Sequence, residues 1–127
     1  MPALNFKPEF VPAIEADEKR QTIRPKRKWP IRTGDSLYLF TGMRTRSCRR
    51  IGVATCLLER DITIKENGTI LVEGQAIYPR SAQRLAIADG FSGLPAFLDF
   101  FKRQYGLPFH GQLIEWDHVD RRLGEDS

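Results

Sequence analysis

The sequence predicts an α+β fold, in which a small, mostly antiparallel β-barrel is flanked by two or three helices. Two observations carry this prediction. Apolar residues alternate on both sides of Asn67-Gly68, which predicts a β-hairpin over residues 61–72. Apolar residues at helical spacing from Leu94 to Tyr105 predict an amphipathic helix that packs beside the strands.

The first half of the chain is expected to form one short helix, one extended segment and two strands. These elements cover residues 8–17, 19–24, 36–40 and 51–58, in that order. Pro8 suits the first turn of a helix, and Pro25 disfavours helical backbone at the residue before it. Residues 36–40 are apolar on both faces, which predicts a buried strand.

After the hairpin, the sequence predicts two helices and a closing strand. They cover residues 81–88, 94–105 and 111–118. Ser92 is the expected N-cap of the longer helix, and Gly106 is its expected end. We expect a single domain over residues 1–120 and a polar C-terminal tail over residues 121–127.

Positive charge is concentrated in one quarter of the chain. The net charge is +4, but residues 19–50 hold 11 of the 20 basic residues against Asp35 alone, a local charge of +10. This asymmetry predicts an electropositive face that attracts phosphates and polyanions. A solvated charged surface without a ligand is the alternative.

No stretch has the length of a membrane span and no signal peptide is recognisable, so we expect a cytoplasmic protein without a membrane partner. The two cysteines, Cys48 and Cys56, are expected to be reduced thiols. Together with His110 and His118 they show no metal-binding spacing, and neither a metal nor a cofactor is expected.

Four segments, in this order, resemble the ASCH family. They are Ile14–Arg24 with its Lys-x-x-Thr-x-Arg pattern, Gly34–Leu39, the stretch from Asp89 to Gly106, and Gln112–Trp116. The resemblance implies a PUA-like barrel with a cleft and a role connected with RNA. Small bacterial members are similar in size and remove the acetyl group from N(4)-acetylcytidine, another branch is reported to cleave RNA, and members in transcription coactivators are binding modules.

The amidohydrolases of the family use a lysine, a threonine and a glutamate, which match Lys19, Thr22 and Asp89 in this sequence. A neutral lysine accepts the proton of a threonine nucleophile, and burial or neighbouring cations make a lysine neutral. Asp89 would orient the site or act as an acid, although it is one methylene shorter than the family's glutamate. Alternatively, Lys19 is a surface charge, Thr22 an ordinary strand residue and Asp89 a turn residue.

The expected nucleic-acid-binding residues lie in two basic loops, over residues 26–32 and 41–50, and in the extended segment before the first loop. They are Arg20, Arg24, Lys26, Arg27, Lys28, Trp29, Arg44, Arg46, Arg49 and Arg50. Trp29 either stacks on a base or folds back to plug the end of the barrel. The loop over residues 41–47 is a candidate phosphate cradle.

Three functions follow. The first is a module that binds RNA or a modified pyrimidine nucleoside in a basic cleft, with DNA a less favoured partner. The others are a metal-independent amidohydrolase acting on N(4)-acetylcytidine and a ribonuclease. The sequence assigns no oligomeric state.

Overall fold

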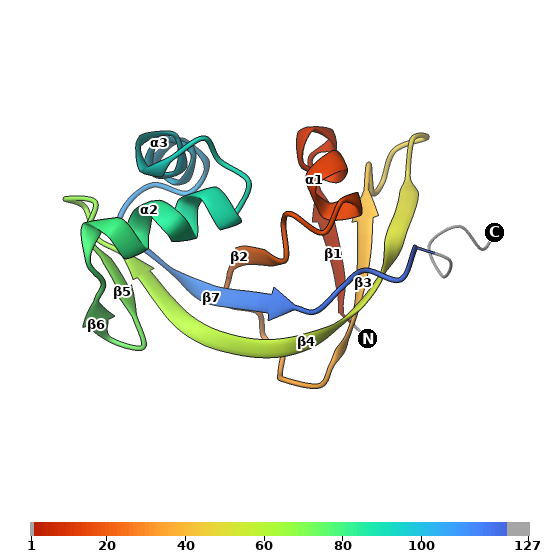
Figure 1. The fold of residues 1–127 in the computed structure, drawn as a ribbon, viewed down its shortest axis with the longest axis horizontal. Helices are drawn as coiled ribbons and strands as arrows, with labels where there is room; N and C mark the ends of the chain where they lie inside the picture. The colour runs from red at the N-terminus through yellow and green to blue at the C-terminus, as the bar shows by residue number, and fades with distance from the viewer. Residues whose placement is uncertain (1, 122–127) are drawn as a thin grey trace.

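A computed structural model describes residues 2–121, which form one mixed sheet of seven strands with three α-helices and a short 3-10 helix (Figure 1). The strands are β1 Ala3–Phe6, β2 Gln21–Pro25, β3 Ser36–Thr41, β4 Arg49–Ile64, β5 Ile70–Val72, β6 Gln75–Ala76 and β7 Phe109–Trp116. The helices are η1 Pro8–Phe10, α1 Val11–Glu15, α2 Pro79–Ala88 and α3 Leu94–Gln104. The predicted tail lies outside the described residues, except for Arg121.

The long strand β4 organises the sheet and runs along the whole molecule (Figure 1). Its first half pairs with β3, and its second half pairs with β7 and, near its end, with β5. β2 pairs with β7, whereas β1 pairs with β3 and is parallel to it. Across β4, the strand order is therefore β2-β7-β4-β3-β1. The mixed sheet and its helices confirm the predicted α+β class.

A closed barrel is not confirmed, because β1 and β2 are not paired with each other in the part of the chain that the structure describes. Two carbonyl oxygens of β1 instead accept hydrogen bonds from arginine side chains. Arg24 donates to the carbonyl of Asn5 at 2.6 Å, and Arg27 donates to that of Ala3 at 3.2 Å. We call this arginine-bridged gap the β1–β2 seam.

The buried apolar side chains form two clusters on the one sheet. The first joins β1, α1, β3 and the start of β4, and the second joins α2, α3, β5 and the end of β4. β7 contributes to both, since Leu113 belongs to the second cluster while Ile114 and Trp116 belong to the first. Neighbouring residues of a strand face opposite ways, so one strand connects both cores.

Most predicted elements are confirmed, including the hairpin at Asn67-Gly68 and the helix beginning at Leu94. Two details are wrong. Residues 51–58 and the first hairpin strand are a single strand, with a register shift between Cys56 and Leu58 that bends it. Ser92 is not the N-cap of α3. Its place is taken by Gly93, and the Gln83 side chain of α2 accepts the N–H of Leu94 at 2.7 Å.

Candidate functional site

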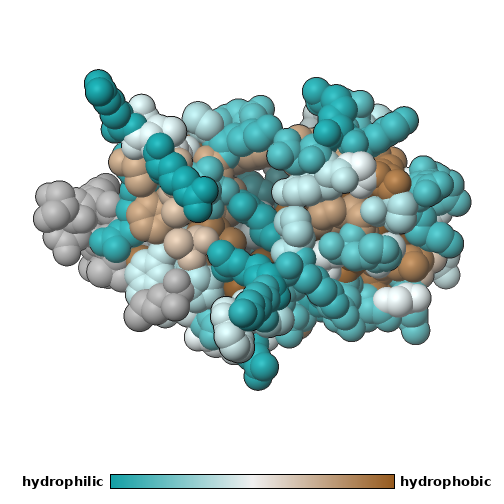
Figure 2. All heavy atoms as spheres, turned by 180° about the vertical axis from the view of Figure 1, so that it is seen from behind, coloured by the Kyte–Doolittle hydropathy of each residue, from teal (hydrophilic) through white to brown (hydrophobic). Residues whose placement is uncertain are grey.

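A cavity of about 220 Å³ lies between the two apolar clusters, at the end of the β1–β2 seam where Arg24 contacts Asn5. Its walls come from β1, β2, the end of α2 and the last turns of α3. Figure 2 shows a recess at this boundary, between the half of the molecule with α1 and the half with α2 and α3. All three predicted catalytic residues, Lys19, Thr22 and Asp89, line this cavity together with Arg24.

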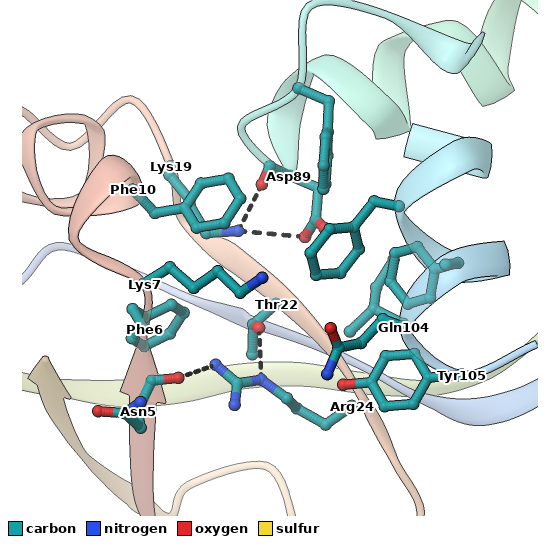
Figure 3. A pocket seen from close by; sticks show the side chains of 14 residues that line it. Asn5, Phe6, Lys7, Phe10, Lys19, Thr22, Arg24, Asp89, Gln104 and Tyr105 are labelled. Carbon is teal, nitrogen blue, oxygen red and sulfur yellow. Dashed lines mark hydrogen bonds and ion pairs between the residues drawn. The ribbon is translucent and has the colours of Figure 1, made fainter. Parts of the chain in front are cut away.

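Lys19 and Asp89 form a buried ion pair at the cavity wall (Figure 3). The Lys19 side chain is 3% exposed, and its Nζ donates to the Asp89 backbone oxygen at 2.6 Å and to Oδ1 at 3.2 Å. The alternative that Lys19 is a surface charge is therefore wrong. Nζ also lies 5.1 Å from the centre of the Phe10 ring, so apolar and aromatic groups surround the amine.

Local backbone turns bring these two residues together. After α1, Asp17 adopts a φ of +59°, and the N–H groups of Glu18 and Lys19 both return to the carbonyl of Ala13. This turn directs the lysine inward. Asp89 is the C-cap of α2 and precedes Gly90, whose φ is +101° and where a Cβ would lie 2.8 Å from the Phe10 ring.

Burial moves both members of the pair towards their neutral forms. Desolvation lowers the pKa of Lys19 below its ordinary value of 10.5, against the opposing charge and hydrogen bond of Asp89, while Arg24 lowers it further. Desolvation likewise raises the pKa of Asp89 above 3.8, although Lys19, Gln21 and Arg24 oppose this shift. A lysine in this setting gives up its proton more readily than a surface lysine does.

Thr22 is buried on β2, and its Oγ1 accepts a hydrogen bond from Arg24 Nε at 2.9 Å. Arg24 also donates to Asn5, and its Cζ lies 4.7 Å from the centre of the Phe6 ring, so the guanidinium is fixed (Figure 3). A cationic donor on a hydroxyl oxygen stabilises the alkoxide form. Lys19 Nζ bonds to Asp89 rather than to Thr22 in this structure.

Several residues in or next to the cavity have no clear signal in the sequence. Gln21 supports Asp89 from behind, because its Nε2 donates to Asp89 Oδ1 and to the Leu85 carbonyl, both at 3.3 Å. Lys7 reaches across the cavity from the start of η1, with Nζ 4.9 Å from the centre of the Phe100 ring (Figure 3). Helical spacing identified Tyr105 only as core, yet it is 42% exposed and lines the opposite wall.

The predicted nucleic-acid-binding residues are dispersed. Arg24 lies in the cavity, while Arg27, Lys28 and Trp29 line a second hollow of about 840 Å³ beside β1. Lys26 pairs with Asp61 on the surface, Arg49 pairs with Glu15, and Arg20 donates to the Asp17 carbonyl. Arg44 and Arg46 are exposed in the second basic loop, and Arg50 at the start of β4 is half-buried.

Trp29 is 79% exposed, so the interpretation that it plugs the end of a barrel is wrong. Three backbone N–H groups of the loop over residues 41–47 already donate within the protein, which speaks against a phosphate cradle. The N–H of Met43 donates to Asn5 Oδ1, that of Thr45 to the Gly42 carbonyl, and that of Ser47 to Thr45 Oγ1. The bond to Asn5 also ties this loop to β1.

Within residues 2–121, no group of three or more His, Cys, Asp or Glu side chains is arranged to hold a metal ion. Cys48 is exposed and Cys56 is buried, where desolvation raises the pKa of its thiol. None of the described helices has the length and apolar character needed to cross a lipid bilayer.

The fold matches solved ASCH structures from Zymomonas mobilis. The unmutated protein aligns at a TM-score of 0.57 and 13% identity, over 94% of this chain and 66% of that one. The chain has an ASCH-like fold. Two point variants of the Zymomonas protein align at the same TM-score, with 13% and 15% identity, over 94% and 92% of this chain and 67% and 69% of theirs. No protein-family model matches the sequence, and no curated protein matches it significantly.

Proposed function

We propose that the cavity binds a pyrimidine nucleobase carrying an acylated exocyclic amine, and that it hydrolyses this amide to give cytidine and acetate from N(4)-acetylcytidine. The observation that carries the proposal is the buried Lys19 amine, held by Asp89 in the same small cavity as Thr22 and Arg24. Buried titratable groups in a cleft mark candidate catalytic sites. The substrate follows from the sequence resemblance to the amidohydrolases.

The size and lining of the cavity support a small, planar ligand. About 220 Å³ lies below the ~300–1,000 Å³ that is typical of pockets for drug-sized molecules. Phe6, Phe10 and Tyr105 offer aromatic surfaces to a base, and Arg24 offers a donor to its carbonyl oxygen. A nucleobase satisfies both requirements at once.

In the proposed reaction, Thr22 Oγ1 attacks the acetyl carbonyl while its proton passes to the neutral amine of Lys19. The C–N bond then breaks, the leaving N4 atom of cytidine takes that proton, and an acetyl ester remains on Thr22. Water hydrolyses the ester, with Lys19 again as the base, and releases acetate. Asp89 orients the amine, and Arg24 stabilises negative charge on the Thr22 oxygen.

The reaction requires Lys19 Nζ to turn from Asp89 towards Thr22 once the substrate is bound. Catalytic hydrogen bonds often form only in the substrate complex, so the present geometry is compatible with this step. The matching acid of the family is a glutamate. Here Asp89 also holds Lys19 through its backbone oxygen at 2.6 Å, a contact that does not depend on side-chain length.

The test is chromatography of N(4)-acetylcytidine after incubation with purified protein. Cytidine should form with the wild type, and Thr22→Val should lower its rate at least about 100-fold, because the nucleophile is removed at nearly constant volume. Thr22→Ser restores a hydroxyl and should recover part of the rate. Thr55→Val on β4 is the matched control, because Thr55 is an exposed strand threonine outside the cavity.

A folded wild-type protein that forms no cytidine would refute the amidohydrolase. Equal rates for wild type and Thr22→Val would refute Thr22 as nucleophile. If the protein instead shortens RNA in the presence of a chelator, and Thr22→Val abolishes this, the same residues serve a ribonuclease. Salt-dependent RNA binding without turnover would make the protein a binding module.

A further inference from the structure

The β1–β2 seam presents two fixed cations side by side. Arg24 and Arg27 donate to the carbonyls of Asn5 and Ala3, which lie two residues apart on one edge of β1, a spacing of about 7 Å along a strand. Each guanidinium has five N–H donors. Within residues 2–121, neither arginine is in an ion pair, and Arg27 uses only one of its nitrogens for hydrogen bonding.

The seam lies between the cavity and the second hollow, and β1 contributes lining residues to both. Asn5 and Arg24 line the cavity, whereas Ala3 and Arg27 line the hollow of about 840 Å³. An acidic side chain on the seam would repel a phosphate. Of the residues that line the second hollow only Asp35 is acidic, and its Oδ2 accepts the N–H of Arg32 at 2.9 Å.

Trp29 stands in this second hollow with its ring free. It is 79% exposed, and Lys28 Nζ lies 5.8 Å from the ring centre. Covering this exposed ring with a ligand would be favourable, because burial of apolar surface contributes about 25 cal/mol per Å². A nucleobase stacks on such a ring while neighbouring cations bind its phosphate.

We propose that the Trp29 hollow is a second base-binding subsite, and that the protein acts on its modified base more efficiently within a single-stranded oligonucleotide than in the free nucleoside. The modified base enters the cavity, the adjoining phosphate lies on Arg24 and Arg27, and the neighbouring base stacks on Trp29. The assignment of the first base to the cavity rests on the proposed function. The Trp29 subsite itself rests on the seam and the exposed ring.

The first experiment compares free N(4)-acetylcytidine with a short single-stranded oligoribonucleotide that contains one N(4)-acetylcytidine. We expect a higher kcat/KM for the oligonucleotide. Trp29→Ala should lower that value about tenfold or more by removing one stacked base, and leave turnover of the free nucleoside unchanged. Tyr78→Ala, which removes an equally exposed aromatic residue outside both hollows, should change neither value.

The second experiment measures binding of an unmodified oligonucleotide by fluorescence anisotropy, which needs no turnover. Trp29→Ala should weaken binding of the single strand, and a duplex of the same length should bind less tightly. Arg27→Met should reduce the slope of log K against log salt by about 0.7, the value for one phosphate contact with a single strand. Ribose and deoxyribose strands run in parallel show which sugar the subsite accepts.

The outcomes separate the two proposals. If neither acetylated substrate is hydrolysed but Trp29→Ala weakens single-strand binding, the proposed function fails and the subsite stands. If the nucleoside and the oligonucleotide are hydrolysed with equal kcat/KM, and Trp29→Ala changes neither turnover nor binding, the subsite is refuted and the proposed function stands.

Discussion

Replacing Asp89 by asparagine tests whether its carboxylate balances the buried positive charge of Lys19. The change keeps the volume of the side chain and an oxygen acceptor, but removes the negative charge. Both interactions that raise the pKa of Lys19 come from Asp89, so in the variant the pKa of Lys19 falls further below 10.5. The ammonium form of Lys19 then has no buried counterion.

Breaking a buried ion pair by removing one partner costs about 3–5 kcal/mol. With a urea m-value of about 2 kcal/mol per molar, this cost lowers the unfolding midpoint by about 1.5–2.5 M. The sign of the pH dependence follows from linkage. A lysine whose folded pKa lies below its unfolded value contributes stability above pH 10.5 that is lost as the pH falls through the folded pKa. The penalty in Asp89→Asn should therefore shrink as the pH rises.

Wild-type Asp89 has the opposite dependence. Its raised pKa contributes stability below pH 3.8 that is lost as the pH rises through the folded value, and the asparagine variant lacks this contribution. The assay is urea unfolding at several pH values between 6 and 10, followed by circular dichroism. Asp99→Asn is the control, because Asp99 forms an exposed ion pair with Arg103 whose loss costs at most about 0.5 kcal/mol. Equal midpoints for Asp89→Asn and wild type at every pH would refute the buried charge pair.

Three further outcomes are expected. Turnover of N(4)-acetylcytidine should rise with pH and level off below pH 10.5, because only the neutral Lys19 amine accepts a proton; a pH-rate profile that falls over this range would contradict its role as a base. Gly111→Ala should lower both activity and melting temperature, because the added Cβ would collide with the Arg24 backbone oxygen and push β2 away from β7. Unchanged activity would show that the position of Arg24 on β2 does not matter for turnover. Phe97→Ala should cost about 3–5 kcal/mol of unfolding free energy, and the half-buried Leu98→Ala clearly less, as urea unfolding can show; equal losses would mean that the buried face of α3 is misassigned.

Local patterns predicted those parts of the fold that depend on neighbouring residues. The Asn67-Gly68 hairpin and the helix beginning at Leu94 follow from turn chemistry and from apolar spacing. The cap of α3 was mispredicted because its acceptor, Gln83, comes from another helix, eleven residues earlier. The length of β4 was missed because the register shift at Cys56 interrupts the alternation that identifies a strand.

The candidate site was also predicted only in part from the sequence. The resemblance to the ASCH family pointed to Lys19, Thr22 and Arg24 through the family's Lys-x-x-Thr-x-Arg pattern, and it also pointed to Asp89. Gln21 and Lys7 carry no such pattern. Their roles depend on side-chain directions, which become defined only when β2 meets α2 and when η1 faces α3.

By itself the sequence determined the α+β class, the hairpin, the amphipathic helix and the concentration of positive charge between residues 19 and 50, because these depend on composition and short-range spacing. The tertiary structure alone decided that Lys19 is buried against a carboxylate 70 positions away and that Trp29 remains exposed. It also decided that the side chains of Arg24 in β2 and of Arg27 just after it bind the carbonyls of β1, in place of strand pairing. Desolvation and side-chain contacts across the sheet arise only when distant segments pack together, and the chemistry of the cavity depends on both.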